Sequence, residues 1–110
     1  MRIFLKRNKS GIDAVAEYDV DTQTVTVLSG SKVSSKIAYS ATFRGAKSIE
    51  KQRENTVRDN IVMQDVQFKS LSTAANYVTG ASTNGLVAWK DALGKTMREI
   101  RLEEQDNEQN

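Results

Sequence analysis

The sequence predicts one small α+β domain in which antiparallel hairpins pack against two helices and a C-terminal hairpin closes the fold. Residues 12–20 alternate between apolar and polar side chains, a pattern typical of a half-buried strand. Residues 48–61 and 72–79 instead carry helical patterns with capping signals. A chain of 110 residues has the length of a single domain with one modest core.

The N-terminal part is expected to form strands. The apolar residues 3–5 favour an edge strand, and residues 12–20 and 24–28 favour a hairpin around a polar turn. Residues 31–47 are rich in Ser, Ala and Lys. They indicate an irregular connection that contains one short strand around residues 37–39.

The first helix is expected over residues 48–61, with Ser48 as its N-cap. Arg53 lies on the apolar stripe of this helix. We expect its stem to be buried and its guanidinium to bond carbonyl groups or an acid, in preference to a phosphate. A short extended segment at residues 63–68 follows.

The second helix is expected to have Ser72 as its N-cap and to end at Gly80. An Asn84-Gly85 turn then leads into a strand over residues 86–90, which pairs with residues 95–100 in the closing hairpin. Trp89, the only tryptophan, is expected in the core against the alanine-rich helix; stacking on a nucleic-acid base is the alternative.

The composition argues against an enzyme. The chain has no Cys and no His, so it lacks disulfides, a thiolate, the commonest general base and the commonest zinc ligand. No cofactor is expected. No apolar run has the length of a membrane span, and the N-terminus does not match a secretory signal, so we expect a cytoplasmic protein without a membrane partner.

Charge is unevenly distributed along the chain. The last ten residues carry a net charge of −3, which leaves +5 on residues 1–100. We therefore expect a mildly basic folded domain over residues 1–100 and an acidic, disordered tail over residues 101–110. A basic domain permits a polyanionic partner.

An acidic ladder on the strand at residues 12–20 and its turn is the nearest approach to a metal site. Two carboxylates two residues apart on a strand can share a hard cation, but solvation of an outward strand face explains the same pattern more simply. The ladder consists of Asp13, Glu17, Asp19 and Asp21.

Residues 29–36, SGSKVSSK, have the small residues and lysines of a phosphate-gripping loop, without the spacing of a Walker A motif. Lys32, Lys36, Arg44 and Lys47 are the candidate phosphate contacts. A solvated loop without a partner is the alternative interpretation.

A second candidate site surrounds the Asn-Gly turn. Exposed amides and hydroxyls in such a turn can contact phosphates or base edges, although most turns of this kind only reverse the chain. Ser82, Thr83, Asn84 and Lys90 are expected to line the recognition side.

The chain resembles the bacterial domain-of-unknown-function family 4357. The resemblance covers roughly residues 4–100 and rests on GIDAVAEY (11–18), VLSGSKVS (27–34), STAANYVTG (72–80), NGLVAWK (84–90) and GKTM (94–97). The last third is also similar to the restriction-system adenine-methylase-associated domain. Leu86 stands where many relatives would carry an aromatic residue.

The resemblance implies an accessory module of the kind attached to GIY-YIG nucleases or restriction-modification proteins. We therefore expect a non-catalytic module that binds nucleic acid, most simply DNA, with a nuclease or restriction-system protein as a partner. The alternative is a protein-interaction or oligomerisation module that uses residues 3–5 or the closing hairpin as an exposed edge. A carboxylate-metal enzyme is the third hypothesis.

Overall fold

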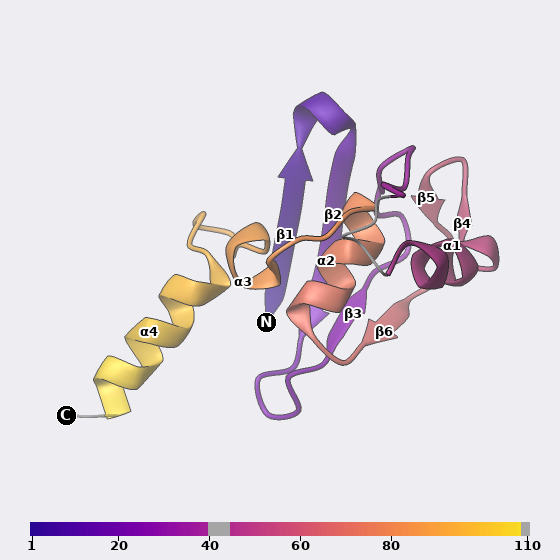
Figure 1. Ribbon diagram of the computed structural model, residues 1–110. Coiled ribbons are helices and arrows are strands. Elements are labelled where there is room, and N and C mark those ends of the chain that lie inside the picture. The colour runs from indigo at the N-terminus through magenta and orange to yellow at the C-terminus, as the bar shows by residue number, and fades with distance from the viewer. Residues whose placement is uncertain (40–44, 109–110) are drawn as a thin grey trace.

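A four-stranded antiparallel sheet, in the order β1-β2-β3-β6, forms the centre of the protein (Figure 1). The computed structural model describes residues 1–39 and 45–108. The sheet consists of β1 (Arg2–Arg7), β2 (Ile12–Tyr18), β3 (Val25–Val27) and β6 (Val66–Phe68). A short 3-10 helix, η1 (Asn8–Ser10), connects β1 to β2. The predicted α+β class is confirmed.

The alternation in β2 orients its side chains as predicted. Ile12, Ala14, Ala16 and Tyr18 are buried, and Asp13 is exposed. The strand ends at Tyr18, two residues before the predicted end, because the Asp19 carboxylate accepts hydrogen bonds from the N–H groups of the following turn. β1 is an edge strand, as expected from its apolar segment.

The region after the first helix differs from the prediction. Helix α1 (Ala46–Glu54) has Gly45 rather than Ser48 as its N-cap, and it ends at Glu54, before the predicted end at residue 61. The rest of the predicted helix forms part of a hairpin of β4 (Val57–Arg58) and β5 (Ile61–Val62). Asp59 and Asn60 at its turn both have positive φ, of 54° and 64°. Asp and Asn tolerate this conformation, which two-residue hairpins require.

The predicted short strand at residues 37–39 does not form. Helix α2 (Leu71–Thr79) begins two residues earlier than predicted, with Ser70 as its N-cap: the Ser70 side chain accepts a hydrogen bond from the Thr73 N–H. Ser72 instead accepts one from the Gly85 N–H. The helix ends at Gly80 in the left-handed conformation, as predicted.

The predicted closing hairpin is wrong. Residues 85–88 form a short helix, α3 (Gly85–Ala88), because the Asn84 side chain caps it by accepting from the Leu86 N–H. A single bridge, from Lys90 to Thr96, remains of the expected pairing, and Lys90 also bridges to Phe4 of β1. Residues 97–108 form helix α4 (Met97–Glu108), which extends from the body of the domain (Figure 1). Helix therefore occupies most of the segment expected to be a disordered tail.

The core lies between the sheet and α2. Trp89 is fully buried in it, and its indole Nε1–H donates to the Leu71 carbonyl at 3.0 Å. Ala74, Ala75 and Val78 of α2 belong to the same buried cluster. The prediction that Trp89 is a core residue is confirmed, and its burial removes it from any stacking surface.

Arg53 holds α1 to the end of α2, and it contacts carbonyl groups as predicted. Its guanidinium donates to the Tyr77 carbonyl from both Nε and a terminal nitrogen, at 3.0 and 2.7 Å. It also donates to the carbonyls of Val78 and Ser34. Burial lowers the pKa of Arg53, because desolvation disfavours the charged form. Carbonyl groups near a helix C-terminus stabilise that charge.

Candidate functional site

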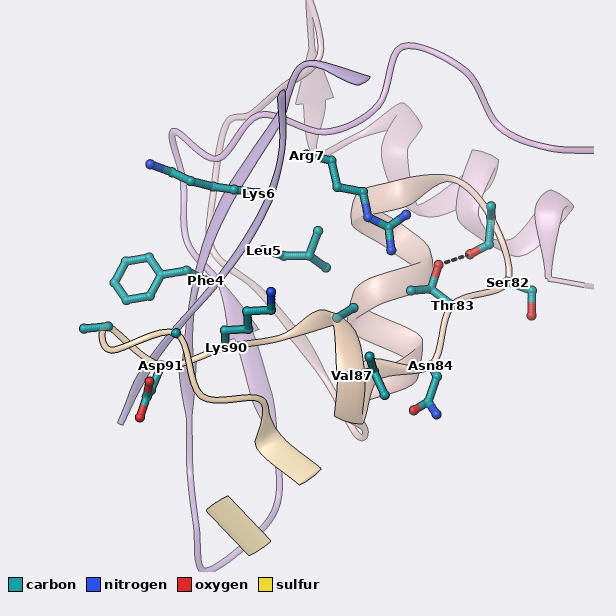
Figure 2. Close-up of a pocket in the computed structure, with 14 residues that line it drawn as sticks. Phe4, Leu5, Lys6, Arg7, Ser82, Thr83, Asn84, Val87, Lys90 and Asp91 are labelled. Carbon is teal, nitrogen blue, oxygen red and sulfur yellow. Dashed lines mark hydrogen bonds between the residues drawn. The ribbon is translucent and has the colours of Figure 1, made fainter. Parts of the chain in front are cut away.

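A cleft of about 760 Å³ opens between the edge of β1 and the segment that surrounds α3 (Figure 2). Three segments of the chain form its walls. They are residues 4–7 of β1, residues 81–84 after α2, and residues 87–94 around the end of α3. A cleft of this size falls in the range that binds small molecules or single segments of a polymer.

Backbone pairing between Phe4 and Lys90 positions the cleft. The Phe4 N–H donates to the Lys90 carbonyl at 2.7 Å, and the Lys90 N–H donates to the Phe4 carbonyl at 2.9 Å. This pair joins the loop after α3 to the outer edge of the sheet. It therefore places the Lys90 side chain beside β1, although 86 positions of sequence separate the two residues.

Three cationic side chains, from Lys6, Arg7 and Lys90, line the cleft, and all three residues are exposed. In Figure 2 the Arg7 side chain extends from β1 toward residues 81–84, and that of Lys6 extends to the opposite side of the strand. Within residues 1–39 and 45–108, none of the three belongs to a salt bridge. Their positive charge is thus available to an anionic ligand.

Asp91 is the acidic residue among those that line the cleft. Its carboxylate accepts hydrogen bonds from the Leu93 and Lys95 N–H groups, both at 2.9 Å. These contacts hold the turn at residues 91–95 and direct the carboxylate toward the turn's own backbone. The three cations therefore outweigh the negative charge at this site.

The polar loop at residues 81–84 is partly committed to internal contacts. The Thr83 hydroxyl contacts the Thr79 hydroxyl at 2.7 Å. It also donates to the Ala81 carbonyl at 3.0 Å (Figure 2). The Asn84 oxygen caps α3, which leaves its amide NH₂ group pointing outward. Ser82 is exposed. The Ser82 hydroxyl and the Asn84 amide are thus the polar groups of this loop best placed to meet a ligand.

The structure brings together half of the predicted site. Ser82, Thr83, Asn84 and Lys90 line the one cleft. Lys32, Lys36 and Lys47 are exposed but lie outside it, and Arg44 lies outside the described residues. The backbone of Lys32 instead bridges Asp13 of β2 and Ile61 of β5.

Phe4, Lys6 and Arg7 also line the cleft, although they were not predicted as site residues from the sequence. The Lys6-Arg7 pair directly follows the apolar segment of β1, and a basic pair at the end of an edge strand was the available signal. The pairing of that edge with Lys90 could not be read from local sequence, since it joins opposite ends of the chain.

The acidic ladder is used mainly for local contacts. Glu17 accepts a hydrogen bond from the Arg2 side chain at 2.7 Å, and Asp19 holds the turn after β2. Bonds from the backbone N–H groups of Thr22 and Asp21 lower the pKa of Asp19. No group of three or more carboxylates that could hold a metal ion occurs in the part of the chain that the structure describes.

Comparison with protein families places most of the chain in a known family. Residues 4–101 match the model of a family described as "Domain of unknown function (DUF4357)". The chain belongs to the DUF4357 family. The match runs from within β1 to the start of α4, and it includes every residue that lines the cleft.

A search of curated proteins and a search of solved structures gave no match to this DUF4357 domain. Over residues 1–39 and 45–108, the domain contains no helix with the length and apolar character needed to cross a bilayer.

Proposed function

We propose that this DUF4357 domain is a non-catalytic module that binds nucleic acid, most simply DNA, through the cleft beside β1. The observation that carries the proposal is that three cationic residues, Lys6, Arg7 and Lys90, border one cleft without an acidic partner among the described residues, Lys6 on the other side of β1 from Arg7. Phosphate groups are the most abundant anions on a nucleic acid, and lysine and arginine are the side chains that contact them most often.

The polar loop supports the same proposal. Ser82 and Asn84 belong to the loop that lines the cleft, and their side chains point outward from this loop, where they could contact sugars, phosphates or base edges. In this proposal the domain is an accessory unit in the cytoplasm that brings a partner nuclease or restriction-system protein to its substrate. Its own residues hold the nucleic acid and perform no reaction.

The alternative, a protein-interaction module with an exposed strand edge, has less support. The predicted closing hairpin is absent, and Lys90 occupies the edge of β1 at Phe4. Strand addition requires a row of unpaired N–H and C=O groups, and this pairing interrupts the row in the middle of β1.

A fluorescence anisotropy titration with labelled DNA, at about 50 mM salt, tests the proposal. We expect binding that weakens as salt rises, and a loss of about tenfold or more in affinity for the double variant Lys6→Ala/Lys90→Ala. The double variant Lys36→Ala/Lys47→Ala removes the same charge from exposed positions outside the cleft. It serves as the matched control.

The two variants separate the possible results. A large loss in the cleft variant with a small loss in the control supports the cleft. Equal losses would mean that net charge, and not the cleft, causes binding. No binding of single-stranded or duplex DNA by the wild type at tens of micromolar, on the order of the weakest non-specific complexes, would overturn the proposal. A salt-insensitive dimer in light scattering would then favour the protein-interaction alternative.

A further inference from the structure

In the described portion of the chain, the edge of β1 that faces the cleft has one position, Lys6, where the backbone N–H and C=O are not paired with a neighbouring strand. We call this position the opening. Both backbone groups of Phe4 bond to Lys90, so they point away from β2. Alternate residues of a strand direct their backbone groups to the same edge, so those of Lys6 point to this edge as well. An independent contact agrees: Asp13, the partner of Lys6 in β2, directs its own N–H and C=O to Lys32. The Lys6–Asp13 pair is therefore of the non-hydrogen-bonded type.

Helix α3 keeps the opposite segment from closing this opening. Continuing the antiparallel register from the Phe4–Lys90 pair would place Ala88 opposite Lys6. The Ala88 N–H, however, donates to the Asn84 carbonyl within α3 at 3.0 Å. Within residues 1–39 and 45–108, the outward N–H and C=O of Lys6 have no backbone partner, and both Lys6 and Ala88 line the cleft.

The opening is too short for a peptide strand. The Phe4–Lys90 pair closes it on one side, and η1 begins at Asn8 on the other. Only Lys6 remains between them, and it offers one donor and one acceptor side by side. A strand added to a sheet needs several such pairs in a row, whereas a single base carries a donor and an acceptor side by side on its Watson–Crick edge and can bond to one residue.

The surfaces on either side suit the other parts of a nucleotide. Phe4, at the mouth of the cleft, is partly exposed and presents an aromatic ring on the same face of β1 as the Lys6 side chain (Figure 2). An aromatic ring of this kind can stack on a base. Arg7 and Lys90 supply charges for the phosphates on both sides of the opening.

We propose that the cleft receives an unpaired nucleotide of a single-stranded nucleic acid, with the base edge bonded to the Lys6 backbone and the flanking phosphates held by Arg7 and Lys90. This inference rests on the proposed function and narrows it. In a duplex the Watson–Crick edge is already paired, so the Lys6 backbone groups select for single strands.

Proline substitution tests the backbone contact directly. Lys6→Pro and Lys6→Ala both remove the side chain and its charge, but only proline also removes the outward N–H. Because that N–H does not belong to the β1–β2 ladder, an edge strand tolerates proline there. We expect wild type to bind single-stranded DNA at least about tenfold more tightly than duplex, and Lys6→Pro to lose about another tenfold relative to Lys6→Ala, the size of one hydrogen bond. Circular dichroism checks that both variants fold.

Amide hydrogen exchange gives a second measurement on the wild type. The Lys6 amide should exchange quickly in the unbound protein and slow down when single-stranded DNA is added. A fast amide in the saturated complex, or equal affinity for single-stranded and duplex DNA, would overturn this inference while leaving the broader proposal of nucleic-acid binding intact. If Lys6→Pro does not fold, the exchange measurement alone decides.

A poly-glutamate peptide serves as a polyanion without bases. We expect it to bind more weakly than the oligonucleotide and without slowing the Lys6 amide. Binding as tight as that of the oligonucleotide, with the same protection at Lys6, would mean that the edge accepts a peptide strand and would overturn the inference. Absence of binding to any DNA would instead contradict the proposed function as a whole.

Discussion

The guanidinium of Arg53 donates two hydrogen bonds to the carbonyl oxygen of Tyr77, at 2.7 and 3.0 Å. The same group lies 5.9 Å from the centre of the Tyr77 ring. Through this contact the short helix α1, most of whose residues are exposed, is attached to the end of α2 and thus to the core. This planar cation adds to the small apolar contact that Ala46 and Ile49 of α1 make with Ile37.

Replacing Arg53 with Ala should lower the free energy of unfolding by about 2–4 kcal/mol, because carbonyls at the end of α2 lose a charged donor. Arg53→Lys should recover part of this loss, since a single ammonium cannot reproduce the planar fork. Urea unfolding measures both. Arg58→Ala, at an exposed position, is the control and should change stability by less than about 0.5 kcal/mol. Equal effects at the two positions would show that Arg53 does not connect the helices.

Gly85 is required by packing. A Cβ atom at this position would overlap the backbone of Leu71 and Ser72, at the start of α2. Gly85→Ala should therefore displace α3 and destabilise the fold by about 1–3 kcal/mol or more. Gly94→Ala is the comparison: Gly94 has a φ of +86° with open space around it, so it should cost only about 1 kcal/mol of backbone strain. Thermal unfolding that ranked Gly94→Ala as the worse variant would contradict the close contact of α3 with α2.

Trp89→Phe should destabilise the protein by about 1–3 kcal/mol, because it leaves the buried Leu71 carbonyl without its indole donor and leaves space in the core. Tyr39→Phe also removes one donor from an aromatic side chain, but from an exposed one that bonds Glu50. It should have an effect below about 0.5 kcal/mol. The comparison uses urea unfolding. Similar losses of stability in the two variants would mean that the buried indole contributes little to the free energy of unfolding.

Asp19 should make the stability depend on pH. Its folded-state pKa lies below the ordinary 3.8, through hydrogen bonds from Thr22 and then Asp21. Its contribution is therefore present above the unfolded-state pKa and is lost as pH falls through the folded value. Asp19→Ala should cost more stability at about pH 6 than at about pH 2. A cost that stayed constant over this range would show that the carboxylate charge does not hold the turn.

Several parts of the fold could be predicted because short stretches of sequence determine them. The alternation in residues 12–18 gives β2 its buried face, and Gly80 ends α2 in the left-handed conformation. Thr96 and Glu99 form the start of α4, where the Glu99 N–H donates to the Thr96 side chain. The Thr-x-x-Glu pattern is typical of a helix start, although residues 95–100 were expected to form a strand.

Other parts were mispredicted because local preference favoured the wrong element. Val87 and Trp89 favour a strand, but the cap at Asn84 and the contact of Gly85 with α2 favour α3. The hairpin of β4 and β5 continues a helical pattern in sequence, and its Asp59-Asn60 turn overrides that pattern.

The sequence by itself determined the α+β class, the buried position of Trp89 and the carbonyl contacts of Arg53, since each depends on residue type and short-range spacing. Only the tertiary structure decided which cations share a surface. Lys6 and Arg7 meet Lys90 because backbone hydrogen bonds join Phe4 to Lys90, whereas Lys32, Lys36 and Lys47 lie outside the cleft. Such long-range pairing depends on the packing of the whole chain, and no local pattern of charge encodes it.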